Sequence, residues 1–78
     1  MQLQYIVTEI QTLGETIAVL NFQFDTLREA EAKYHSILAV AAVSTLPMHA
    51  AVLLTNAGTL VKSEYYDHTV APEPETAP

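Results

Sequence analysis

The chain has no cysteine, no tryptophan and only two glycines among its 78 residues. Without cysteine, neither a disulfide nor a cysteine-based zinc site can brace so small a fold. Gly14 and Gly58 stand alone, so there is no glycine-rich phosphate-binding loop, and neither a Gly-x-Ser-x-Gly elbow nor a cysteine nucleophile is present. We therefore expect a protein that is not an enzyme and that needs no cofactor.

Basic residues and long apolar runs are also scarce. Three Lys and Arg stand against nine Asp and Glu, and the formal charge of −6 argues against unspecific binding to nucleic acid or to an anionic membrane. The longest apolar run extends only from Ile37 to Val43, which is too short to span a bilayer. No basic segment precedes an apolar stretch at the start, as a secretory signal requires. These features predict a small, acidic, cytoplasmic protein.

Proline is concentrated at the C-terminal end. Three of the four prolines lie in residues 71–78, with two glutamates between them and no apolar side chain larger than alanine. Prolines remove backbone donors and neighbouring acids repel each other, so this segment cannot contribute to a core. We predict a disordered Pro/Glu tail over residues 71–78 and a single domain over residues 1–70.

The pattern of apolar residues predicts the order strand-strand-helix-strand-strand. Residues 3–12 are rich in β-branched and aromatic side chains, and residues 16–25 alternate between two faces, which is typical of strands. Thr26 and Glu29 match a capping box that begins a helix, and Pro47 ends it.

The second half of the chain predicts another hairpin. Residues 48–55 and 59–68 flank the turn signal Asn56-Ala57-Gly58. The fold class expected is α+β, with one helix packed on a four-stranded, mainly antiparallel sheet.

More apolar surface is present than this fold can bury by itself. One helix covers one face of a sheet, yet both faces of the first two strands carry aliphatic residues, and the helix is apolar all round from Ile37 to Val43. We therefore expect a homo-oligomer, a dimer or a tetramer, although a tightly curled monomer stays open as the alternative. The candidate interface residues are Ile37, Ala39, Val40, Val43, Ile17 and Val19.

Few side chains suggest chemistry. Two acid pairs could be proposed for acid–base chemistry, Glu29 with Glu31 and Glu64 with Asp67, but both are better explained as solvated surface. The histidines lack the spacing of a zinc site, so we predict no metal.

Cations that lie close to aromatic residues or histidines in the sequence give a clearer signal, one of ligand binding. Tyrosines stack on flat ligands, and Lys, Arg and protonated His balance phosphate charge. If copies of the chain assemble, several copies of each cation come together at a shared pocket. Taken one at a time, each of these residues is better explained as a core residue, an edge-strand residue or a charge that promotes solubility. The candidate ligand-binding residues are Arg28, Lys33, His35, Lys62, Tyr66 and His68.

Three segments resemble a set of small, uncharacterised proteins encoded in prophages of Gram-positive bacteria. These segments are Tyr5–Gln11 (YIVTEIQ), Glu29–His35 (EAEAKYH) and His49–Leu54 (HAAVLL), and the likeness spans most of residues 2–68. The resemblance transfers no activity, but it implies a viral setting. Small phage proteins of this size resemble either accessory structural pieces or inhibitors of bacterial defence.

Two functional hypotheses follow. The first is a non-enzymatic phage protein that antagonises host defence as an oligomeric sponge for an immune signalling nucleotide. The second is a structural or protein-interaction module that binds a virion or host protein. A hydrolase or transferase is a remote third.

Overall fold

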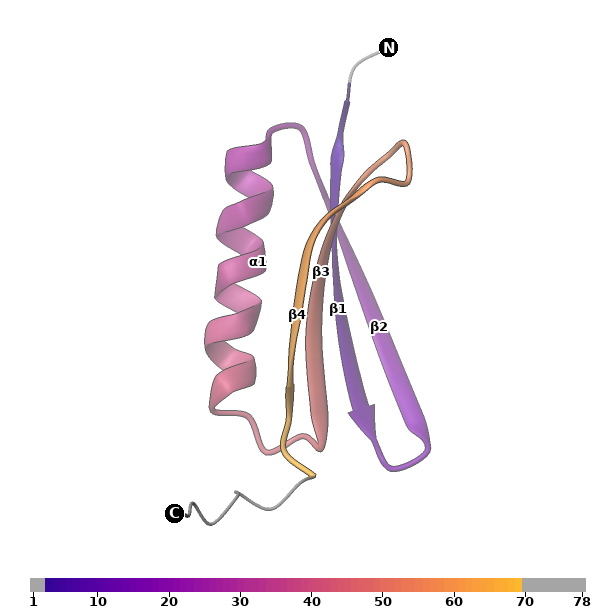
Figure 1. Ribbon diagram of the computed structural model, residues 1–78, viewed down its shortest axis with the longest axis vertical. Helices are drawn as coiled ribbons and strands as arrows, with labels where there is room; N and C mark the ends of the chain where they lie inside the picture. The colour runs from indigo at the N-terminus through magenta and orange to yellow at the C-terminus, as the bar shows by residue number, and fades with distance from the viewer. Residues whose placement is uncertain (1–2, 70–78) are drawn as a thin grey trace, which may run out of the picture.

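A computed structural model describes residues 3–69 and shows an α+β fold with one helix packed on one antiparallel sheet (Figure 1). The predicted tail at 71–78 lies outside the described residues. The elements, in chain order, are β1 (Tyr5–Leu13), β2 (Thr16–Phe24), α1 (Leu27–Ala42), β3 (Met48–Thr55) and β4 (Leu60–Asp67). The predicted element order is confirmed.

The strands lie in the order β2-β1-β3-β4, so each hairpin contributes one central and one edge strand. The two central strands pair antiparallel, from Tyr5 opposite Thr55 to Thr12 opposite Met48. Both hairpin turns contain a glycine with positive φ, 64° at Gly14 and 87° at Gly58. This backbone region is strained for residues with a Cβ atom, which explains why the chain's two glycines stand at these turns.

The helix begins where the capping box predicts. Thr26 is the N-cap, and its hydroxyl accepts a hydrogen bond from the Glu29 backbone N–H at 3.2 Å. The same hydroxyl donates to the Glu29 carboxylate at 3.1 Å. The helix ends at Ala42, with Val43 as the C-cap, so that the chain can turn before Pro47.

The core lies between α1 and the facing side of the two central strands. Its buried members come from the helix (Ala30, Tyr34, Ile37) and from β1 and β3 (Val7, Ala51, Leu53), with Tyr5, Phe22, Phe24 and Leu38 packed around them. Ile37 was predicted at an interface between copies. It is only 4% exposed because it faces the sheet from the buried side of the helix, so this prediction is wrong.

The other side of the sheet has no helix over it. Because side chains alternate along each strand, the register assigns one set of residues to this side. We call it the open face. Its members are Ile6, Thr8, Ile10 and Thr12 of β1; Ile17, Val19, Asn21 and Gln23 of β2; Met48, Ala50, Val52 and Leu54 of β3; and Ser63, Tyr65 and Asp67 of β4. Within residues 3–69, no helix is long and apolar enough to cross a bilayer.

Candidate functional site

The two lysines of the predicted ligand site lie on opposite flanks of the helix. The Lys33 ammonium sits 4.1 Å from the centre of the Phe22 ring, towards edge strand β2. Lys62, on the other edge strand, pairs with Glu31 at 3.3 Å and lies 5.6 Å from the Tyr34 ring centre. Each lysine already has a partner within the chain, and the buried core separates the two.

The other predicted ligand-binding residues are also dispersed. Tyr66 and His68 do come together, with stacked rings 6.2 Å apart, and a ring nitrogen of His68 lies 3.0 Å from the Ala41 carbonyl oxygen. Arg28 is exposed in the first helical turn, while His35 is exposed near the middle of the helix, with its ring edge-on to Tyr34. The residues that the structure describes enclose no pocket, so one copy does not assemble the predicted site.

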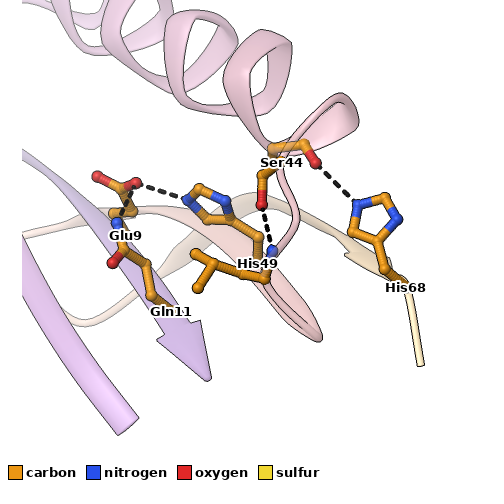
Figure 2. A network of polar contacts seen from close by, with 7 residues as sticks. Glu9, Gln11, Ser44, His49 and His68 are labelled. Atoms are coloured by element: carbon orange, nitrogen blue, oxygen red, sulfur yellow. Dashed lines mark hydrogen bonds and ion pairs between the residues drawn. The ribbon is translucent and has the colours of Figure 1, made fainter. Parts of the chain in front are cut away.

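A largely buried histidine–carboxylate pair, which the sequence did not predict, lies between the helix and the sheet. His49 Nε2 and Glu9 Oε2 are 2.6 Å apart, and the side chains are 2% and 14% exposed. Gln11 Nε2 donates to the same carboxylate oxygen at 2.9 Å. Figure 2 shows Glu9 and Gln11 on one side of the His49 ring, with Ser44 and His68 on the other, beneath the end of the helix. The pair links the two central strands.

The environment of this pair favours an ionised carboxylate. Burial by itself would raise the pKa of Glu9, but hydrogen bonds from Gln11 and His49, together with the charges of His49 and Lys33, lower it below its ordinary value. His49 Nδ1 is buried without a hydrogen-bond partner. The imidazole is only 2% exposed, and its contact with Glu9 joins β1 to β3.

One sequence signal could have revealed this pair. In the alternation of the first strand, Glu9 falls on the same face as Tyr5 and Val7, which are core positions. A carboxylate on a core-facing position needs a buried partner. His49 has the corresponding core-facing place in the third strand, but only the pairing of β1 with β3 brings the two together.

The lowered pKa of Glu9 predicts a loss of stability in acid. Because the folded-state pKa lies below the ordinary glutamate value of about 4.5, ionised Glu9 stabilises the fold fully above that pH. This contribution is lost as the pH falls through the folded-state pKa. Urea unfolding between pH 6 and pH 3 measures it, and Glu9→Gln is expected to flatten part of the acid slope. Identical slopes for the two proteins would contradict this assignment.

Within the described part of the chain, histidines and carboxylates do not gather into a metal centre. His49 is bound to Glu9, while His35 and His68 lie on the helix surface and beyond β4. Across residues 3–69, no group of three histidine or carboxylate side chains is placed to hold an ion.

The open face exposes large apolar side chains of the described chain. Ile17, Val19 and Tyr65 are 63%, 54% and 62% exposed on it. Val19, Ile10, Ala50 and Tyr65 form one cross-strand row over all four strands. Of the predicted interface residues, Ile17 and Val19 lie here, whereas Ala39 and Val40 are exposed on the helix and Val43 is exposed at its C-cap.

Known proteins supply no further guide to the site. No protein-family model, curated protein or solved structure matches the chain.

Proposed function

We propose that this protein is a non-enzymatic interaction module that works as a homo-oligomer, with a second copy of the chain packed on the open face. One observation carries the proposal: within residues 3–69, a sheet face that exposes large apolar side chains, among them Ile17, Val19 and Tyr65, has no helix to cover it. Large exposed apolar patches are rare on monomers and mark interaction surfaces.

The area of the open face supports a contact between two copies. Four strands about 4.8 Å apart, with eight residues each rising about 3.3 Å, cover roughly 500 Å² in projection. That projected area is more than half of the accessible area of about 800 Å² per partner that standard interfaces bury. Packing two sheets face to face creates a second core of the β-sandwich type.

Charge also favours a second copy on this face. The protein carries a formal charge of −6, so most orientations of two copies repel each other. Within residues 3–69, the open face bears only one carboxylate, Asp67, at its margin. Two copies that meet there bring few like charges together.

The nucleotide-sequestering function expected from the sequence is the second candidate. Its support is the stacked Tyr66–His68 pair and the multiplication of Lys33 and Lys62 by assembly. Because these groups lie apart in one chain, such a site needs more than one copy. Isothermal calorimetry of the assembled protein with cyclic dinucleotides and ADP-ribose tests this, and an absence of heat removes the candidate. A role against host defence, implied by the prophage resemblance, depends on the same result.

The variant Tyr65→Glu tests the open-face proposal. It places a carboxylate in a row that the second copy would bury, so we expect at least a tenfold weaker self-association, which corresponds to about 1.4 kcal/mol. Sedimentation velocity at micromolar concentrations measures the mass. Ala32→Glu is the matched control, because it adds the same charge at an exposed helix position away from the open face.

Two results would contradict this proposal. One is a wild-type protein that sediments as a folded single chain at micromolar concentration. The other is an assembly that Tyr65→Glu and Ala32→Glu weaken equally, since the effect would then come from net charge and not from the open face.

A further inference from the structure

The two edge strands of the sheet differ in how well they are protected. Edge strands expose unpaired N–H and C=O groups, and natural proteins block them with charges, prolines, bulges or short length. Strand β4 follows this rule: it carries Lys62, Glu64 and Asp67, and its pairing with β3 shifts register between Leu53 and Leu54. This edge is closed to another strand.

Strand β2 has none of these protections. Its nine residues, TIAVLNFQF, include no charge and no proline. They pair with β1 in one unbroken register from Thr16 opposite Leu13 to Phe24 opposite Tyr5. Ile17, Val19 and Leu20 are 63%, 54% and 42% exposed, so apolar side chains stand open on both sides of this strand. In Figure 1 the β1–β2 hairpin diverges from the helix towards its tip, which leaves this edge uncovered.

The direction of the free backbone groups follows from the hairpin turn. Gly14 and Glu15 form a two-residue turn between Leu13 and Thr16. A turn of this kind is closed by a hydrogen bond between its flanking residues. Counting from this turn, residue pairs of β1 and β2 that exchange backbone hydrogen bonds alternate with pairs that do not. The N–H groups that point away from β1 are those of Ile17, Val19, Asn21 and Gln23.

We propose that β2 pairs with β2 of a second copy, antiparallel about a two-fold axis, to form a continuous eight-stranded sheet. A two-fold contact requires a surface that complements itself. An uncharged strand meets this requirement, because no like charges come opposite each other, and β-branched cross-strand pairs stabilise it. This contact is independent of the open face, and the two together generate a tetramer of dihedral symmetry.

Two substitutions at one position separate edge pairing from packing of the open face. Val19→Pro removes an outward N–H but keeps an apolar side chain, and proline is tolerated on an edge strand in this orientation. Val19→Thr keeps the N–H and the branched shape but makes the side chain polar. We expect Val19→Pro to halve the sedimenting mass at micromolar concentration, and Val19→Thr to leave the β2 contact intact. Val19→Pro combined with Tyr65→Glu should yield single chains.

Amide hydrogen exchange on the wild-type protein gives a readout that does not depend on whether a variant folds. In the assembly, the Val19 and Asn21 amides should exchange at least tenfold more slowly than those of an unprotected peptide. When the protein is diluted to single chains, the exchange of these two amides should become fast again. Outward amides that exchange freely in an assembled sample, or an unchanged mass for a folded Val19→Pro, would overturn the inference. If Tyr65→Glu fails to lower the mass but Val19→Pro succeeds, only the open-face proposal falls.

Discussion

Replacing Glu9 by alanine is expected to lower the free energy of unfolding by about 2–4 kcal/mol. Glu9 is the hydrogen-bond partner of His49, whose imidazole is 2% exposed and whose Nδ1 has no partner. Without the carboxylate, both ring nitrogens are buried and unsatisfied. Urea denaturation at pH 7 measures the loss, with protein concentration held constant because self-association adds to stability.

A matched control variant and a double variant test whether the loss of stability comes from the contact between Glu9 and His49. Glu64→Gln alters an exposed acid in the same cross-strand row as Glu9 and should change stability by less than about 0.5 kcal/mol. Glu9→Leu combined with His49→Phe replaces the whole pair by apolar side chains and should recover at least half of the loss, as for other buried pairs. Equal effects of Glu9→Ala and Glu64→Gln would show that the buried pair contributes nothing specific.

Leu53→Ala is expected to cost about 2–5 kcal/mol, the range for buried leucines. Leu53 is fully buried between β3 and the helix, among Val7, Tyr34 and Ile37. A domain of this length has a total stability of about 4–12 kcal/mol, so the variant should be largely unfolded at the lower end of that range. Circular dichroism with urea titration measures this.

The neighbouring residue supplies the comparison for Leu53. Leu54 lies on the open face, where a single chain leaves it partly exposed. Leu54→Ala should therefore cost less in dilute protein, and its effect should grow with concentration as the open face becomes buried. A cost for Leu54→Ala that equals that of Leu53→Ala at every concentration would contradict the assignment of these residues to opposite faces.

Most of the fold could be predicted from local signals. The capping box at Thr26, the turn glycines and the alternation of residues 16–25 each act within a few residues, so the sequence displays them directly. The prediction of Ile37 as an interface residue failed for a related reason. An apolar segment of helix shows that surface must be buried, but not which side faces the sheet.

The candidate site was predicted less well. In the structure the aromatic neighbours of Lys33 and Lys62 are Phe22 and Tyr34, which are not the neighbours that the sequence suggested, and the two lysines flank opposite sides of the helix. The spacing of the cations along the chain does not reveal this separation, because it depends on which strands form the edges.

The sequence alone determined the order of elements, the place of the turns and the excess of apolar surface, since these depend on neighbouring residues. Only the tertiary structure decided that β1 and β3 lie side by side, which buries Glu9 against His49 and leaves β2 as an edge. Strand pairing joins residues 40 positions apart, as Glu9 and His49 are. No local pattern encodes which of the possible partners a strand selects, because that choice depends on how the whole sheet and helix pack.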